Sequence, residues 1–445
     1  MVESSKLTAQ EALQSARETR ALEIGRNILG KTPQIFREQF PGQPAVIVAD
    51  QNTFALAGKA ISYAFGQGGQ NCEPPFIFDD TNLYAEFKFV EQLEASLKKH
   101  QAIPVAVGSG AINDLTKLAA HRTNRPYMCI ATAASMDGYT AFGASVTFNG
   151  SKQTFNCPAP TAVLADIEII RKAPPEMTAS GYADLLAKIT AGADWIVADA
   201  LGIELIDPQA WKIVQGGLRD SLSDPIGSRN GNAEAIEKLT EGLMLGGFAM
   251  QWSKTSRPAS GAEHQFSHLW DMQHHTHNGS APSHGFKVGV ATLAVANFYE
   301  FLLTQPLENL DVEKSCAAWP DEAAIPSAIQ KMFPEKEIAD KSIEETLAKY
   351  ISREKLREQL EQLRVIWPEL KSHLRNHLIP AATMKQMLHD AGAPTEPEQI
   401  GISRERLRDS YRQAYHLRRR FTVLDLAVRA NLLEPGLRHL FEGSK

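Results

Sequence analysis

Residues 103–121 read IPVAVGSGAINDLTKLAAH and join a short apolar strand to an amphipathic helix through two glycines. Ile103–Val107 has the length and the β-branched content of a buried strand. Gly108 and Gly110 permit a tight turn into the helix, and backbone N–H groups at such a helix N-terminus suit a pyrophosphate. An ordinary strand-to-helix turn explains the pattern equally well, because Asn113 stands where GxGxxG requires its third glycine.

The same order of strand and helix recurs on both sides of this stretch. Val46–Val48 is followed by a helical segment, and Pro75–Phe78 and Tyr127–Ala131 are further strand candidates. Alternating strands and helices predict a parallel sheet. Asp50 lies at the carboxyl end of the first strand, where an acid either hydrogen-bonds an adenosine ribose or caps the next helix. Asp137, in a loop of small residues after the last strand, is suited to accept hydrogen bonds from a polyol.

The two ends of the chain have a different pattern from this middle part. Residues 1–40 carry apolar side chains at approximately helical spacing, which predicts one or two lead-in helices. Pro174 and Pro175 disfavour helix locally, and helical patterns dominate beyond them. The sequence therefore predicts an α/β domain over residues 1–174, which includes the helical lead-in, and an all-helical domain over residues 175–445.

Composition excludes several classes of function. The 445 residues, of which 43% are hydrophobic, suffice for two domains with separate cores. A net charge of −6 with dispersed charges argues against a nucleic-acid partner. The N-terminus does not resemble a signal peptide, and no apolar run approaches the roughly 18 residues of a membrane span. Four scattered cysteines predict reduced thiols and no sulfur-bound metal. We therefore expect a cytoplasmic protein.

Residues 260–289, SGAEHQFSHLWDMQHHTHNGSAPSHGFKVG, hold six of the thirteen histidines. His264 and His268 lie one helical turn apart, and neutral imidazoles are common zinc ligands. The His-Glu-x-x-His motif does not fit, because Glu263 precedes the first histidine. Both a metal site and an amphipathic helix that displays two histidines stay open on this pattern. Three further histidines are predicted to be loop residues: His274, His275 and His277.

Five motifs in this order resemble the glycerol-1-phosphate dehydrogenases: GSGAINDLTK, TAASMDGY, SGYADLLAKITAGADW, SGAEHQFSH and HGFKVG. These enzymes belong to the superfamily of iron-containing alcohol dehydrogenases, glycerol dehydrogenases and dehydroquinate synthases. The resemblance covers residues 40–300 and leaves the remaining C-terminal residues unassigned beyond their helical pattern. It implies a Rossmann-like nucleotide-binding domain, a helical domain and a divalent metal in the cleft between them, most commonly zinc, with nickel or iron in some members.

The resemblance also implies the residues of the site. The metal ligands are Asp184, His264 and His284, and the substrate-contacting, catalytic residues are Asp137 and His268. NAD or NADP is bound by the acid Asp50 at its ribose and by two backbone segments: Gly108, Gly110, Ala111, Ile112, Asn113 and Asp114, then Thr132, Ala133, Ala134 and Ser135. The chain departs from the family pattern at Ala141, where a serine is expected, and in the HHTHN insertion before His284.

The implied reaction interconverts dihydroxyacetone phosphate and sn-glycerol 1-phosphate, so the partner is a small phosphorylated three-carbon substrate, and the resemblance implies a homo-oligomer, most simply a dimer. Alternatives are a cyclase similar to dehydroquinate synthase, a glycerol (polyol) dehydrogenase, and a binding module without turnover. Lys188 alternatively pairs with Asp184 on a helix surface. Four basic residues are candidates for the substrate phosphate: Lys152, Lys188, Arg257 and Lys287.

Overall fold

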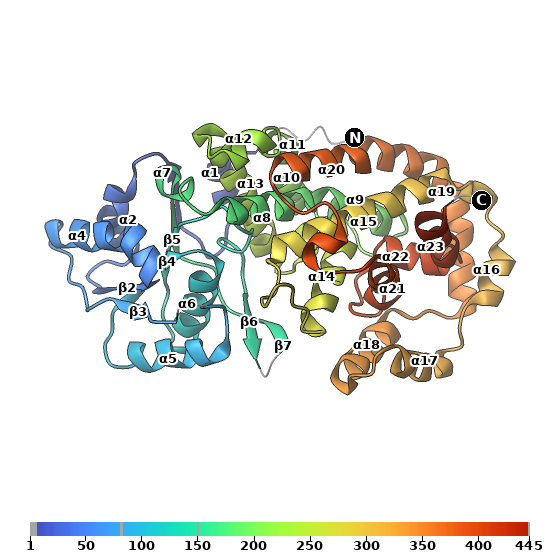
Figure 1. Cartoon of the computed structure of the whole chain (residues 1–445), viewed down its shortest axis with the longest axis horizontal. Coiled ribbons are helices and arrows are strands. Elements are labelled where there is room, and N and C mark those ends of the chain that lie inside the picture. The colour runs from blue at the N-terminus through green and yellow to red at the C-terminus, as the bar shows by residue number, and fades with distance from the viewer. Residues whose placement is uncertain (1–6, 81–82, 149–150, 444–445) are drawn as a thin grey trace. The chain divides into compact units, whose positions relative to one another are not determined.

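The computed structural model describes residues 7–80, 83–148 and 151–443 (Figure 1). The chain forms two compact units and passes more than once between them. Unit 1 comprises Met1–Leu185, Pro208–Ser256 and Asp390–Ala393, and unit 2 comprises Leu186–Asp207, Arg257–His389 and Pro394–Lys445. The boundary expected after residue 174 stays a prediction; Pro175 begins a helix, a position at which proline needs no N–H partner.

A six-stranded sheet of parallel strands lies at the centre of unit 1, in the order β1-β8-β5-β4-β2-β3. The sheet confirms the α/β prediction and the four strands expected from sequence. An antiparallel hairpin, β6–β7, follows β5. The strands are β1 (Ala21–Gly25), β2 (Ala45–Asp50), β3 (Phe76–Phe78), β4 (Ile103–Gly108), β5 (Met128–Ala131), β6 (Ala144–Phe148), β7 (Ser151–Phe155) and β8 (Ala162–Asp166).

Helices cover both faces of this sheet. Val105 and Val107 of β4 point into an apolar cluster with Phe36 and Phe65, which come from helices α2 and α4. Alternation along the strand turns Ala106 to the opposite face, where α5 and α6 lie (Figure 1). The helices are α2 (Thr32–Gln39), α3 (Gln51–Thr53), α4 (Lys59–Gln67), α5 (Phe87–Leu97), α6 (Gly110–Arg122) and α7 (Ile167–Ile170), with η1 (Leu29–Lys31) and the π-helix η2 (Phe54–Gly58).

The predicted lead-in of one or two helices is confirmed by α1 (Ala9–Leu13) and α2, but the strand β1, which the helical spacing did not predict, lies between them. Leu22 and Ile24 satisfy both helical and alternating spacing, and parallel pairing with the distant strand β8 selects the extended form. The lead-in chain is held by Gln251 Oε1, which accepts from three successive amides: Arg17, Glu18 and Thr19.

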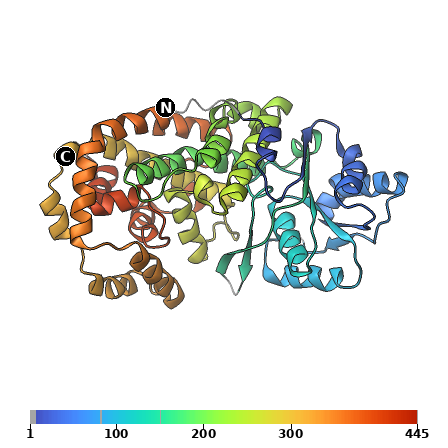
Figure 2. The ribbon, with the colours of Figure 1, turned by 180° about the vertical axis from the view of Figure 1, so that it is seen from behind.

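The remaining helices of unit 1 surround α13 (Ala233–Ser253). This helix packs against α1 and α10 (Figure 2). Its N-cap Asn232 accepts from the amides of Glu234 and Ala235, which fixes where the helix begins. Its neighbours are α8 (Pro175–Leu186), α10 (Pro208–Gln215), α11 (Leu218–Ser221) and α12 (Pro225–Arg229).

All regular elements described in unit 2 are helices, as the sequence predicts. The long helix α19 (Arg353–His377) buries a stripe of leucines and Trp367 at spacings of three and four residues. The others are α9 (Lys188–Ala200), α14 (Ala262–Met272), α15 (His284–Thr304), α16 (Val312–Ala318), α17 (Ile325–Met332), α18 (Lys336–Lys349), α20 (Ala381–Asp390), α21 (Arg404–Ala414), α22 (Val423–Arg429) and α23 (Leu433–Glu442), with η3 (Arg257–Ala259), η4 (Leu307–Asn309), η5 (Glu322–Ala324) and η6 (Pro397–Ile400).

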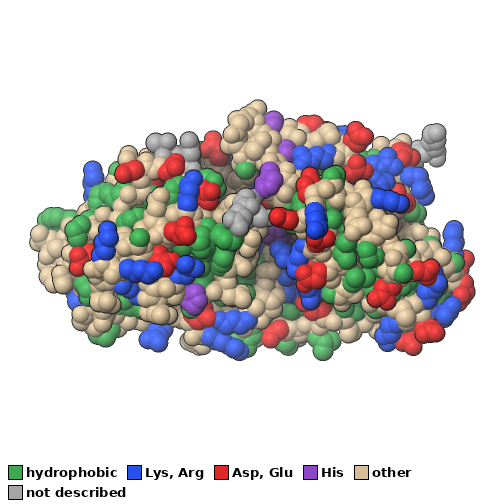
Figure 3. Space-filling view, turned by 90° about the horizontal axis from the view of Figure 1, so that it is seen from below, with side chains coloured by type: hydrophobic (Ala, Val, Ile, Leu, Met, Phe, Trp, Pro, Cys, Tyr) green, Lys and Arg blue, Asp and Glu red, His purple; other side chains and the backbone are tan. Residues whose placement is uncertain are grey.

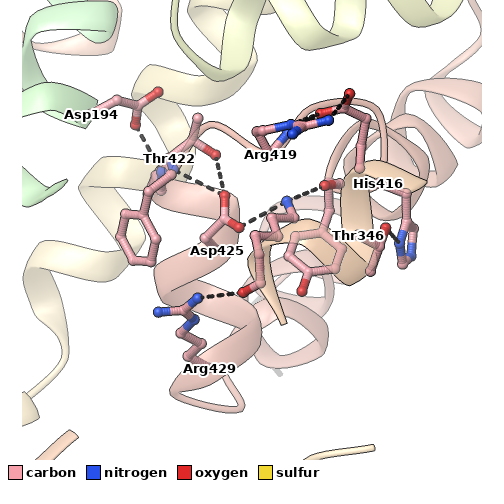
Figure 4. A network of polar contacts seen from close by, with 12 residues as sticks. Asp194, Thr346, His416, Arg419, Thr422, Asp425 and Arg429 are labelled. Atoms are coloured by element: carbon pink, nitrogen blue, oxygen red, sulfur yellow. Dashed lines mark hydrogen bonds and ion pairs between the residues drawn. The ribbon is translucent and has the colours of Figure 1, made fainter. Parts of the chain in front are cut away.

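A buried ion pair joins α18 to α22 in this C-terminal part. Lys349 Nζ lies 2.8 Å from Asp425 Oδ1, with the two side chains 6% and 1% exposed. Lys349 also lies over the ring of Tyr415, and Asp425 accepts from the backbone N–H and hydroxyl of Thr422 (Figure 4). The charges are therefore matched with partners as they leave water, which buried charges require.

Helix α15 corrects the expectation that no segment of this chain is long and apolar enough for a membrane. It passes that test by length and composition. Of its 18-residue apolar window, 83% is buried inside the protein, mainly against α14, α23 and α9. A buried core helix has the same composition, so its apolar character is explained by packing.

Candidate active site

The predicted phosphate-binding loop is the turn from β4 into α6. Ser109 is the N-cap of α6 and makes no side-chain hydrogen bond to it. A Cβ at Gly108 would lie 2.4 Å from Cβ of Ile112, so only glycine fits there. The amide of Thr132 donates to Gly108 O over 3.2 Å, which joins this loop to the second predicted nucleotide segment.

Asn113 and Asp114 hold the loop from within. The hydroxyl of Tyr127 donates to Asn113 Oδ1 over 3.1 Å, and the amide of Ser145 donates to Asp114 Oδ2 over 3.2 Å. Burial raises the pKa of Asp114, and nearby Lys117 partly opposes that shift. Both predicted nucleotide residues therefore also have a structural task, which the sequence pattern did not indicate.

The segment Thr132–Ser135 follows β5 and packs against α8. A Cβ at Gly181 of α8 would lie 2.0 Å from the carbonyl oxygen of Ala134. Ala133 accepts from the hydroxyl of Tyr139 over 2.8 Å. The backbone of this segment is therefore held on both sides.

Asp50 ends β2, the neighbour of β4 in the sheet. Its Oδ1 accepts from the amide of Thr53 over 2.8 Å and caps α3. The capping alternative is therefore confirmed, and contact with a ribose stays a prediction.

The loop that carries Asp137 is tied to a buried lysine and to the predicted carboxylate ligand. The amide of Asp137 donates to Asp184 Oδ2 over 3.2 Å. Lys117 Nζ donates to three carbonyl oxygens of this loop: Gly138 at 3.0 Å, Ala141 at 2.9 Å and Gly143 at 2.9 Å. Ala141, at the position expected to be serine, thus contributes its carbonyl oxygen as an acceptor for Lys117.

Three predicted metal ligands come together. Asp184, His264 and His284 each offer a ligand atom, and these atoms all lie within 4.8 Å of one another. Asp184 and His264 are buried, and His284 is half-buried at the first position of α15. The ring centroid of His264 lies 6.5 Å from the ring centroid of His268 and 5.3 Å from that of His284.

Glu263 completes the arrangement around His264. Its Oε1 lies 2.8 Å from His264 Nδ1, so an Nδ1–H donates to the carboxylate and Nε2 keeps its lone pair for a metal. Thr190 donates to Glu263 Oε2 over 2.9 Å. One carboxylate and two imidazoles, with a carboxylate behind one of the imidazoles, fit a divalent transition metal with a further position open for substrate.

The candidate phosphate-binding residues differ in their surroundings. Arg257 is buried and donates to the carbonyls of Phe421 and Asp194. Lys287 is buried and paired with Asp271. Lys188 is also fully buried, so it does not lie on a helix surface, and its pairing with Asp184 stays a prediction. Lys152, on β7, is half-exposed.

The three histidines of the insertion lie outside helices, as predicted. His275 is buried; its Nε2 lies 2.6 Å from Ile400 O, and Arg406 lies 2.8 Å from its Nδ1. The HHTHN insertion therefore anchors the loop before His284 to η6 and α21. On the face shown in Figure 3, basic and acidic side chains are interspersed, in line with the low net charge.

Residues 23–174 match the family described as iron-containing alcohol dehydrogenase. Glycerol-1-phosphate dehydrogenase (NAD(P)+) of Halalkalibacterium halodurans is 35% identical over 66% of this chain and 74% of its own length. The enzyme of the same name from Geobacillus thermodenitrificans is 28% identical over 87% of each chain.

Solved structures support the same fold. The crystal structure of a probable glycerol dehydrogenase from Sinorhizobium meliloti covers 94% of this chain and 98% of its own, with a TM-score of 0.59 and 16% identity. At that identity the likeness concerns the fold alone.

Proposed function

The chain belongs to the glycerol-1-phosphate dehydrogenases of the iron-containing alcohol dehydrogenase family, and we propose that it interconverts dihydroxyacetone phosphate and sn-glycerol 1-phosphate with NAD(P). The observation that carries the proposal is the cluster of Asp184, His264 and His284. Its donor set suits a metal that polarises a carbonyl, which is the chemistry that hydride transfer to a ketone needs.

A divalent metal, for which zinc is our first choice and nickel or iron the alternatives, would be held by these three side chains and would act as a Lewis acid toward the substrate oxygen. Glu263 keeps His264 in the tautomer that presents Nε2. His268 is placed to orient the substrate or to relay a proton at its imidazole, and the Asp137 carboxylate to bind a substrate hydroxyl. The amide of Asp137 meanwhile orients Asp184.

The nucleotide is proposed to lie along Gly108–Asp114 and Thr132–Ser135, with its ribose at Asp50. The N-terminus of α6, whose N-cap side chain makes no capping bond, supports a pyrophosphate there. Lys152 is proposed for the substrate phosphate because it is half-exposed, whereas the other three candidates are buried: Lys188, Arg257 and Lys287. We also propose a cytoplasmic homo-oligomer.

The test is nicotinamide oxidation followed by absorbance, with NADH and NADPH, using the zinc-loaded protein and a chelated control. Dihydroxyacetone phosphate and dihydroxyacetone are offered in parallel. We expect chelator-sensitive oxidation with the phosphate ester alone. Equal rates with both ketones would instead indicate a glycerol dehydrogenase, and no net turnover would indicate a cyclase or a binding module.

His264→Ala tests the metal ligand set. We expect loss of bound zinc and a fall in kcat/KM of at least about a thousandfold, because the metal supplies several kcal/mol of charge stabilisation. His373→Ala, an exposed histidine on α19, is the matched control and should keep both zinc and activity. Full zinc content in His264→Ala would refute the assignment.

A further inference from the structure

Asp194 is a fully buried carboxylate on α9 that no step of the proposed reaction uses. Three donors from three helices converge on it. The amide of Ala262, the first residue of α14, donates to Oδ2 over 2.7 Å. The amide of Val423, the first residue of α22, and the hydroxyl of Tyr299 on α15 donate to Oδ1 over 2.8 Å and 2.6 Å. Figure 4 shows Asp194 beside the start of α22.

The carboxylate acts as an N-cap supplied from another helix. The N-cap residue of α14, Gly261, has no side chain to accept the exposed amides of the first turn. A Cβ there would lie 2.5 Å from Asp194 Oδ2 and 2.8 Å from Ala191 Cα, so glycine at this position admits the carboxylate. A negative charge at two helix N-termini is also favoured by both helix dipoles.

The capped turn is the one that carries His264, the third residue of α14. Glu263 in the same turn accepts from the amide of Gly261 over 2.6 Å and is bonded to Thr190 of α9. Thr190 and Asp194 are four residues apart, so α9 presents both to this turn from one face. Helix α9 thus fixes the position of the turn through Asp194 and the imidazole partner of His264 through Thr190.

Asp194 also accepts hydrogen bonds from α15, the helix that carries His284, and from α22 in the C-terminal part of the chain. Tyr299 lies on α15, which begins at His284. Val423 begins α22, whose Asp425 is paired with Lys349 of α18. Arg420, just before α22, donates to the carbonyl of Ser260 over 2.6 Å. The C-terminal helices, which the sequence left without a role, are therefore joined to the start of α14.

We propose that Asp194 is a positioning residue that preorganises the two histidine helices for metal, and that the C-terminal helices contribute to metal affinity through it. This inference rests on the proposed metal ligands. Burial and the nearby Glu263 raise the pKa of Asp194, and the hydrogen bonds from the Tyr299 hydroxyl and the Ala262 amide oppose that rise. Loss of one acceptor oxygen of Asp194 loosens the first turn of α14. The distance between the imidazoles of His264 and His284 is then no longer fixed.

The test measures the zinc dissociation constant by competition with a chromophoric chelator, alongside thermal unfolding. Asp194→Asn keeps the shape but replaces one acceptor with a donor, and we expect a rise of about tenfold to a hundredfold in Kd. Tyr299→Phe keeps the buried ring and loses one donor, with an expected rise of about threefold. Asp311→Asn is the matched control: Asp311 caps α16 through the amide of Lys314, so this variant should lose stability and keep the wild-type Kd.

A wild-type Kd in folded Asp194→Asn would overturn the proposal. Should that variant fail to fold, a wild-type Kd in Tyr299→Phe would overturn it as well. A raised Kd in Asp311→Asn would show that general destabilisation is the cause. Because zinc binding is measured without substrate, failure of the proposed activity appears separately, as absent turnover in the wild-type protein that binds zinc.

Discussion

Lys117 allows the most direct test of how unit 1 holds the loop around Asp137. Its side chain is fully buried, and its ammonium group donates to the carbonyl oxygens of Gly138, Ala141 and Gly143 over 2.9–3.0 Å. Lys117→Met keeps the length of the side chain and removes every donor. The loop then has no side chain to satisfy three carbonyls at once.

The magnitude follows from those bonds. A buried acceptor left unsatisfied costs about 1–3 kcal/mol, and Gly138 O keeps a second donor, Asn113 Nδ2 at 3.4 Å, so the carbonyls of Ala141 and Gly143 together give roughly 2–6 kcal/mol. Removing a buried charge returns part of that cost, so we expect the free energy of unfolding to fall by about 3 kcal/mol. Lys117 also lies 3.9 Å from Asp114, whose pKa burial already raises, so the loss should be smaller at acidic pH where Asp114 is protonated.

Urea unfolding and hydrogen exchange of residues 128–148 measure this loss. The exchange measurement is needed because a chain of two units need not unfold in one step. Lys99→Met, on an exposed lysine, is the control and should change stability by less than about 0.5 kcal/mol. A loss below about 1 kcal/mol in Lys117→Met, with unchanged exchange in the loop, would refute the reasoning.

Two further predictions concern the nucleotide segment and the C-terminal helices. Gly181→Ala places a Cβ 2.0 Å from the carbonyl oxygen of Ala134, so the NADH dissociation constant in a fluorescence titration should rise at least about tenfold, whereas Gly66→Ala, where a Cβ meets nothing within 4 Å, should leave it unchanged. Burial raises the pKa of Glu345, but hydrogen bonds, chiefly from Arg419, outweigh it and lower the pKa to about 2. The difference in unfolding free energy between wild type and Glu345→Gln, about 1–2 kcal/mol after allowance for solvent screening, should therefore be full above pH 4.5 and disappear as the pH falls toward 2. Urea curves from pH 7 to pH 3 check this, and a constant difference over that range would contradict it.

The sequence predicted those strands whose signal is local. Ile103–Val107 and Val46–Val48 are β-branched runs directly followed by helices, and both are central strands of the sheet. Strand β1 was missed because its five residues fit two periodicities, and its partner β8 follows about 140 residues later. Pairing across that distance decides the conformation, and no window of sequence contains it.

In the candidate site, too, local sequence indicated some residues and not others. Two histidines one turn apart suggested a metal, but the proposal of Asp184 as its carboxylate ligand came only from the resemblance. Glu263 argued against the His-Glu-x-x-His motif because it precedes the first histidine, and in the structure it hydrogen-bonds the imidazole of His264. Nothing local marks Lys117 either, since a lysine in an amphipathic helix ordinarily faces solvent.

Asp184 and Asp194 lie in the same motif but have different proposed roles in metal binding. Both lie within SGYADLLAKITAGADW, but α8 ends at Leu186 and α9 begins at Lys188, so they belong to different helices. Asp184 accepts from the amide of Asp137, and Asp194 accepts from amides at residues 262 and 423. A substitution at either aspartate should weaken metal binding, but for different reasons. Loss of Asp184 removes one of the proposed ligands, whereas loss of Asp194 keeps all three proposed ligands and misplaces the turn that carries His264. The two variants should therefore differ in saturating zinc, where Asp194→Asn recovers turnover and Asp184→Asn does not.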